Sequence, residues 1–70
     1  MSPRAIRIES HDELHPGDGV LVFADDRYIV GIVVSTEPGT IVFERRDTHE
    51  QIPVDLATAI VFLIEGGLPG

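Results

Sequence analysis

The chain has 70 residues, of which 43% are hydrophobic, and a formal net charge of −7 from twelve acidic residues and five arginines. This length allows one domain, near the size at which a single core is barely sufficient for stability. Without any cysteine, no disulfide can compensate for a small core. The negative charge repels polyanions at long range, which disfavours nucleic acid as a partner without excluding it.

The chain ends and the lengths of the apolar runs predict a soluble cytoplasmic protein. Met1 to Arg4 lacks the apolar core of a signal peptide. The longest apolar run, Ala59 to Ile64, has six residues, far fewer than a membrane span requires. We therefore expect no membrane association. We also expect residues 1–3 and the glycine-rich residues 66–70 to fray.

Short apolar runs rich in β-branched residues, separated by turn residues, predict an all-β fold. The first expected strand, residues 4–9, alternates apolar and charged side chains. A single helical turn should follow it, because Ser10 and Glu13 have the spacing of a capping box. Pro16 and Gly17 then prevent the helix from continuing and favour a tight turn.

The remaining strands are expected at residues 20–24, 28–35, 40–45, 51–54 and 59–64. Pro38 and Gly39 occupy the central positions that a type II turn prefers. Pro53 lacks an N–H donor, so its strand should lie at an edge of the sheet or end there. A 3₁₀ turn is expected over residues 54–58. The sequence thus predicts one domain over residues 1–70, a five- or six-stranded antiparallel barrel, with a small sandwich as the alternative.

Three of the expected strands are apolar on both faces. Because side chains alternate along a strand, Val20 and Val22 oppose Leu21 and Phe23, and the strands at 28–34 and 60–64 show the same pattern. An apolar side chain left in water forfeits roughly 1.5–3 kcal/mol relative to full burial. The pattern predicts a homo-oligomer, with a different protein as the alternative partner. Strand twist and the N-terminal strand could instead cover the second face. Candidate interface residues are Leu21, Phe23, Ile29, Val33, Val61 and Leu63.

Residues 19–64 resemble the Sm-like (LSm) barrels and, more broadly, the SH3-like barrels. The resemblance rests on the strand at 20–23, a short polar turn, and a second strand, 28–34, with Gly31 at its centre. It also rests on residues 51–63, which are similar to the last two strands of these folds and the turn between them. The resemblance implies that Gly31 bends its strand to close the barrel. It also implies a ring in which edge strands of neighbouring subunits pair.

RNA-binding Sm-like proteins carry an Asp/Asn-containing loop after the bent strand and a cationic pair before the last strand. The corresponding positions here are 35–37, which include Glu37 and no Asn, and 55–57, which contain no cation. The resemblance therefore does not extend to the RNA-binding residues of that family. The ring-forming property agrees with the two-faced strands.

Arg45, Arg46 and His49 form the one concentrated cationic stretch. It could bind a phosphate or a nucleic-acid strand through guanidinium contacts. Acidic residues interleave with these cations, so ion pairs on an exposed hairpin are the simpler interpretation. Base stacking would require an exposed aromatic side chain beside the cations, and Phe43 is the one aromatic residue near Arg45 in sequence.

Other polar clusters suggest little chemistry. His11 and His15 lie among acidic residues, but Pro16 prevents them from sharing a helix face, so an acidic loop is favoured over a metal site. Asp25 and Asp26 could be a carboxylate pair for acid–base catalysis, but no nucleophile or second base accompanies them. We therefore interpret them as a turn.

We expect no enzyme, cofactor or metal, and a non-catalytic, self-assembling binding or scaffold module. The leading alternative is a nucleic-acid binder that uses Arg45 and Arg46. An enzyme subunit whose active site forms at an oligomer interface is the third possibility.

Overall fold

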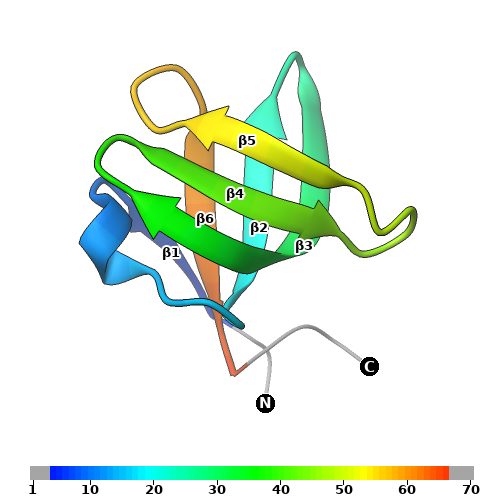
Figure 1. The fold of residues 1–70 in the computed structure, drawn as a ribbon, viewed down its shortest axis with the longest axis horizontal. Helices are drawn as coiled ribbons and strands as arrows, with labels where there is room; N and C mark the ends of the chain where they lie inside the picture. Colours follow the sequence, from blue (N-terminus) through cyan, green and yellow to red (C-terminus); the bar gives the residue numbers. More distant parts are fainter. Residues whose placement is uncertain (1–3, 67–70) are drawn as a thin grey trace.

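The computed structural model describes residues 4–66, which form six strands and one short 3₁₀ turn (Figure 1). The elements are β1 (Arg4–Ile8), η1 (His11–Glu13), β2 (Gly19–Ala24), β3 (Arg27–Glu37), β4 (Thr40–Arg45), β5 (Gln51–Asp55) and β6 (Ile60–Glu65). The all-β class and the position of every expected strand are thereby confirmed. The predicted fraying of residues 1–3 and 67–70 lies outside the described residues.

All strands belong to one antiparallel sheet with the order β1-β6-β2-β3-β4-β5. The prediction of a closed barrel is not confirmed, because within residues 4–66 hydrogen bonds do not join the two edge strands, β1 and β5. The last strand, β6, pairs with β2 on one side and with β1 on the other. The N-terminal strand is therefore one edge of the sheet and β5 is the other.

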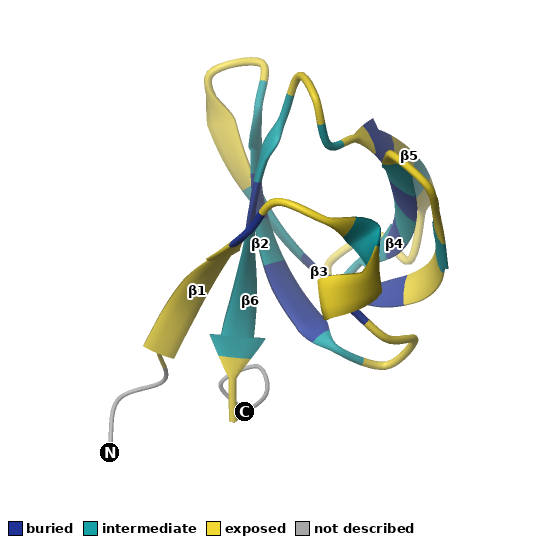
Figure 2. Cartoon of the chain, turned by 90° about the vertical axis from the view of Figure 1, so that its left-hand side faces the viewer, coloured by how far each residue is buried: buried dark blue, intermediate teal, exposed yellow. Residues whose placement is uncertain are grey.

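Curvature of the sheet encloses the core. Figures 1 and 2 show β1, β6 and β2 on one side of the molecule and β4 and β5 on the other, with β3 passing between them. The register of β3 against β4 shifts between Val33 and Ser35, so a bulge interrupts this long strand. Bulges bend a strand and increase its twist, which lets β3 belong to both sides.

The core consists of the inward side chains of every strand and Leu14, which follows η1. The fully buried side chains are Leu14, Val20, Val22, Val33, Ile41, Phe43 and Val61. The other buried members are Ile8 and Val54. Because the core contains no buried polar side chain among the described residues, its stability comes from apolar burial and from the hydrogen-bonded sheet.

Gly31 lies where β3 and β4 approach most closely. A methyl group added at Gly31 would overlap the carbonyl oxygen of Glu44 and would come within 2.5 Å of Cδ2 of Phe43. The absence of a side chain therefore lets the buried Phe43 ring pack directly against the β3 backbone.

The turns use residues with left-handed backbone conformations. Asp25 and Asp26 have φ values of 52° and 61° and join β2 to β3, as expected of a two-residue type I′ turn. Gly39 has a φ of 79° between β3 and β4, in agreement with the predicted Pro-Gly turn. His49 has a φ of 62° in the turn between β4 and β5.

The expected helical turn forms, and the expected 3₁₀ turn before the last strand does not. In η1, the Glu13 carboxylate accepts the backbone N–H groups of Glu9 and Ser10, which is the carboxylate's part in a capping box. Before β6, the N–H groups of Thr58 and Ala59 both donate to the carbonyl oxygen of Asp55. That carbonyl is shared by an i+3 and an i+4 bond, so the segment is one hydrogen-bonded turn and not a 3₁₀ helix.

Pro53 lies on the edge strand β5, as its missing donor predicts. The backbone bonds from Arg45 to Glu50 and from Leu56 to Gly39 flank the β4–β5 ladder. Hydrogen-bonded pairs alternate with non-bonded pairs in an antiparallel ladder, so the pair Val42–Pro53 is non-bonded. The nitrogen of Pro53 therefore points away from β4, and the free edge lacks a donor at its centre.

Candidate interaction surface

The outward side chains of β6, β2 and the first half of β3 form one continuous apolar surface. Cross-strand pairs arrange them in rows, with Phe62 opposite Leu21 and Leu21 opposite Val30 in the central row. A second row joins Ile60, Phe23 and Tyr28 in the same way. We call this surface the outer apolar face; its members are Leu21, Phe23, Tyr28, Val30, Ile32, Ile60, Phe62 and Ile64.

No other described element lies over the outer apolar face. The short turn η1 leads to Leu14, which is buried in the core, so η1 sits on the opposite side of the sheet. Tyr28 is 65% exposed and Ile32 is 44% exposed, and the other members are half-buried by their neighbours in the sheet. The two-faced pattern of the sequence thus corresponds to one buried face and one face that residues 4–66 leave in contact with water.

The predicted interface residues divide between these two faces. Leu21 and Phe23 belong to the outer apolar face. Val33 and Val61 are fully buried in the core, and Ile29 and Leu63 pack against it. These four lie on the inner face of the sheet, and their outward neighbours Val30, Ile32, Phe62 and Ile64 lie on the outer apolar face.

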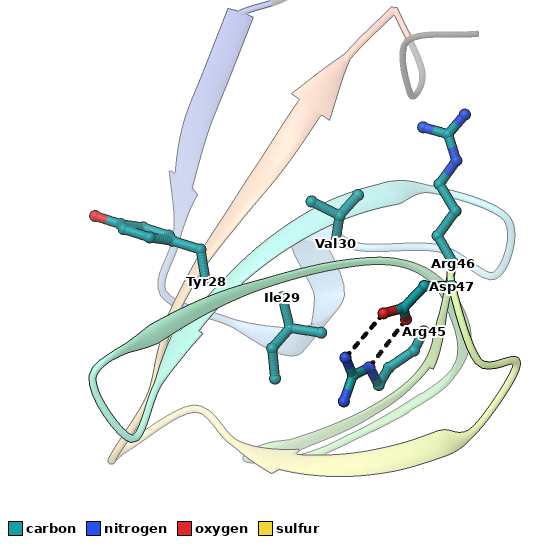
Figure 3. A pocket seen from close by; sticks show the side chains of 6 residues that line it. All are labelled: Tyr28, Ile29, Val30, Arg45, Arg46 and Asp47. Atoms are coloured by element: carbon teal, nitrogen blue, oxygen red, sulfur yellow. Dashed lines mark hydrogen bonds and ion pairs between the residues drawn. The ribbon is translucent and has the colours of Figure 1, made fainter.

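Arginines lie at both ends of the central row. Arg7 of β1 pairs with Phe62, and the backbone N–H of Arg46 donates to the carbonyl oxygen of Val30 at 3.1 Å. Figure 3 shows the side chains of Val30 and Arg46 projecting to the same side of the sheet, and Ile29 projecting to the other. The row therefore runs Arg7–Phe62–Leu21–Val30–Arg46 across five chain segments.

Charge is segregated between the two outer surfaces of the sheet. In the part of the chain that the structure describes, no acidic residue occupies an outward paired position of β1, β6, β2 or the first half of β3. The outward positions of β4, β5 and the end of β3 instead contain Glu37, Glu44 and Asp55 around the pair Val42–Pro53. Glu44 is the cross-strand partner of Ile32, so the two surfaces adjoin between β3 and β4. We call this second surface the acidic face.

A pocket of about 470 Å³ adjoins the outer apolar face beside Val30. It is lined by Tyr28, Ile29, Val30, Arg45, Arg46 and Asp47 (Figure 3). Arg45 is held by two contacts with the Asp47 carboxylate, from Nε at 3.1 Å and from Nη2 at 3.0 Å. This bidentate contact lowers the pKa of Asp47 below its ordinary value of 3.8.

The three predicted cationic residues do not converge on one ligand site. Arg45 and Arg46 line the pocket, but the imidazole Nδ1 of His49 lies 3.2 Å from Oε2 of Glu44 and outside the pocket lining. Tyr28 and Arg46 project from opposite ends of the pocket (Figure 3). The simpler interpretation, ion pairs along an exposed hairpin, agrees with the contacts of Arg45 and His49.

Sequence reasoning missed Tyr28 as the aromatic residue beside the cations. Phe43, the aromatic neighbour in sequence, is fully buried, whereas Tyr28 is largely exposed and lines the pocket with both arginines. Its ring lies against Phe23, with the centroids 4.7 Å apart. Tyr28 lies seventeen residues before Arg45 in the sequence. The pairing of β3 with β4 brings the two close together, and a forecast of that pairing could have identified Tyr28.

A second pocket, of about 300 Å³, lies over inward side chains where the sheet is not closed. Its lining includes Val22, Ala24, Ile29, Ile52 and Ala59. Val22 belongs to the core, and Ala24, Ile29, Ile52 and Ala59 are partly buried against it. These four line the opening between β5 and the β2–β3 hairpin. The polar side chains of its lining are Asp25, Asp55 and Thr58, and Oδ1 of Asp55 accepts the backbone N–H of Ala57 at 2.9 Å.

The remaining polar clusters form local contacts. His15 and Asp18 approach each other across their turn, at 3.9 Å between Nδ1 and Oδ2. Among residues 4–66, no three His, Cys, Asp or Glu side chains gather in a way that could hold a metal ion. Within the same residues, no helix has the length and apolar character needed to cross a membrane.

Comparisons with models of known protein families, with curated proteins and with solved structures find no match to this chain. The fold and the surface therefore define a small all-β protein with a single antiparallel sheet, one face of which is apolar and uncovered in the described chain.

Proposed function

We propose that the protein is a non-catalytic, self-assembling scaffold module in which further copies of the chain cover the outer apolar face. The observation that carries this proposal is the set of registered apolar rows on β6, β2 and β3. Covering several such side chains contributes about 1.5–3 kcal/mol for each one that becomes fully buried. A domain of this size has a total stability of only about 5 kcal/mol, so assembly would be a large part of it.

We also propose that the curved sheet is a small barrel of the Sm-like type. Its support is the close approach at Gly31 and the succession of short antiparallel strands. Assembly through the edge of β5 is less favoured than assembly by faces, because Pro53 removes a donor from that edge.

Sedimentation equilibrium between micromolar and high micromolar concentration tests the proposal. We expect the wild-type chain to exceed its monomer mass of 7.6 kDa, and Phe62→Ser to shift the mass toward that value. Ile6→Ser is the control, because it also replaces an apolar strand side chain by serine, but Ile6 pairs with Leu63 and lies off the outer apolar face. A wild-type chain that remains a monomer throughout this range contradicts the proposal.

A second candidate function is binding of single-stranded nucleic acid at the pocket beside β3. The specific observation is the exposed ring of Tyr28 in the same pocket as Arg45 and Arg46, since single-strand binders combine stacking aromatics with cations. Fluorescence anisotropy with a short single-stranded RNA at two salt concentrations tests it. Binding that weakens with salt and is lost in both Tyr28→Ala and Arg46→Ala supports this function, and absence of binding at low salt removes it.

A further inference from the structure

We infer that the copies assemble head to tail, with the outer apolar face of one copy against the acidic face of the next. This inference rests on the proposed self-assembly and specifies which two surfaces meet. It follows from the distribution of charge over the two faces, from the apolar centre that each face contains, and from their positions on opposite sides of the core.

The two faces are complementary in charge. Arg7 and Arg46 stand at the ends of the central row of the outer apolar face, where the strand positions contain no acid among the described residues. The acidic face contributes Glu37, Glu44 and Asp55. A chain with a net charge of −7 repels its own copies, so contact is favoured where the surface with Arg7 and Arg46 meets a negative one.

The two faces also share an apolar centre. On the acidic face, Val42 and Pro53 are cross-strand partners between the acidic side chains. On the other face, Phe62, Leu21 and Val30 occupy the corresponding central position. An interface with an apolar centre and charged ends is the common arrangement of specific protein contacts.

A symmetric pair that uses the outer apolar face twice is less favourable. If the strands of the two copies are aligned, a two-fold axis along the central row sets Arg7 against Arg7. A two-fold axis across the row sets Arg7 against Arg46. In both arrangements arginine faces arginine, and like charges across an interface are destabilising. The same reasoning applies to a pair formed by two acidic faces.

Head-to-tail contact has a consequence for the size of the assembly. Figures 1 and 2 show β6 and β2 on one side of the molecule and β4 and β5 on the other, so one copy can contact two neighbours at once. A contact between different surfaces continues until a ring closes or a filament grows. The assembly at saturation should therefore exceed a dimer.

A charge-exchange experiment tests the inference. One variant combines Arg7→Glu with Arg46→Glu, and the other combines Glu37→Arg with Asp55→Arg. In the first variant both faces are negative and in the second both are positive, so each alone should associate at least about tenfold more weakly than the wild type. An equimolar mixture should recover the wild-type mass in sedimentation, because each contact then joins faces of opposite charge.

Controls separate the effect of position from the effect of net charge. Arg4→Glu with Arg27→Glu changes the net charge as much as the first variant does, but Arg4 pairs with Glu65 and Arg27 with Ala24, away from the central row. This control should assemble like the wild type. One chain that carries all four exchanges at positions 7, 37, 46 and 55 retains the wild-type net charge and should also assemble on its own. Circular dichroism shows that each variant is folded.

The outcomes distinguish this inference from the proposed function. If the Glu37→Arg/Asp55→Arg variant keeps the wild-type mass alone, the acidic face is not used and the head-to-tail arrangement is wrong, while self-assembly stands. The same conclusion follows if the mixture of two folded, dispersed variants fails to recover the mass. If the wild-type chain is a monomer under all conditions, the proposed function itself fails.

Discussion

Gly31 is the residue at which the fold depends most directly on the absence of a side chain. Its missing Cβ makes room for the Glu44 carbonyl group and the Phe43 ring. The Gly31→Ala substitution should lower the free energy of unfolding by about 1–3 kcal/mol, because the backbone and a buried ring must both shift. Urea denaturation measures the loss, and the NMR signals of the Phe43 ring report the shift.

Gly39→Ala provides the comparison for this prediction. A methyl group at Gly39 meets nothing within 4 Å, and its only cost comes from the positive φ of 79°. This variant should therefore leave the signals of the Phe43 ring unchanged. If Gly31→Ala leaves them unchanged as well, the close approach of β3 and β4 does not depend on the glycine.

Asp47 provides a pH-dependent contact at the residue scale. The hydrogen bonds from Arg45 lower the pKa of Asp47 below 3.8. A carboxyl group with a lowered pKa favours the folded state above pH 3.8, and this contribution is lost as the pH falls through the lowered pKa. An NMR titration should place the Asp47 midpoint below 3.8, and Arg45→Gln should return it toward that value. A midpoint that does not respond to Arg45→Gln shows that the pair is not formed in solution.

At the scale of the element, Pro53 protects the free edge of β5. Its nitrogen faces away from β4, so Pro53→Thr should leave the ladder intact and change the free energy of unfolding by less than about 0.5 kcal/mol. The substitution restores a donor at the centre of an exposed edge, which favours pairing with other chains. We expect faster aggregation, measured by light scattering at constant temperature.

Gln51→Thr is the matched control for the edge prediction. Gln51 is two residues before Pro53 on the same edge and on the same face, and it already has a backbone N–H. This substitution should not accelerate aggregation. Equal rates for the two variants would show that the threonine side chain, and not the restored donor, is responsible.

At the scale of the whole molecule, self-assembly should make thermal stability depend on concentration. Association stabilises the folded state by mass action, and one kcal/mol shifts the Tm of a domain of this size by roughly 4–8 °C. We therefore expect the Tm to rise by a few degrees for a tenfold increase in protein concentration. In Phe62→Ser this dependence should be reduced or absent. A Tm that is independent of concentration in the wild-type chain contradicts the assembly.

The sequence alone determined the strands and their turns, because these depend on local chemistry. Alternating apolar residues, the Pro38-Gly39 turn and the Ser10–Glu13 spacing all led to the elements found in the structure. The sequence also indicated that several strands have two apolar faces. It could not indicate which face is the inner one, because Leu21 and Val22 are equally apolar and differ only in the direction in which the sheet curves.

The tertiary structure decided that direction and everything that depends on it. The sheet is not closed between β1 and β5 in the described residues, and its curvature buries Val33 and Val61 while leaving Phe62 outward. Pairing also brings Arg7 and Arg46 to the ends of one row, although thirty-nine positions separate them in the chain. Such relations are long-range, because they depend on which strands become neighbours and not on the residues adjacent in sequence. An uncovered apolar face was therefore foreseeable from the sequence, and its composition and charge were not.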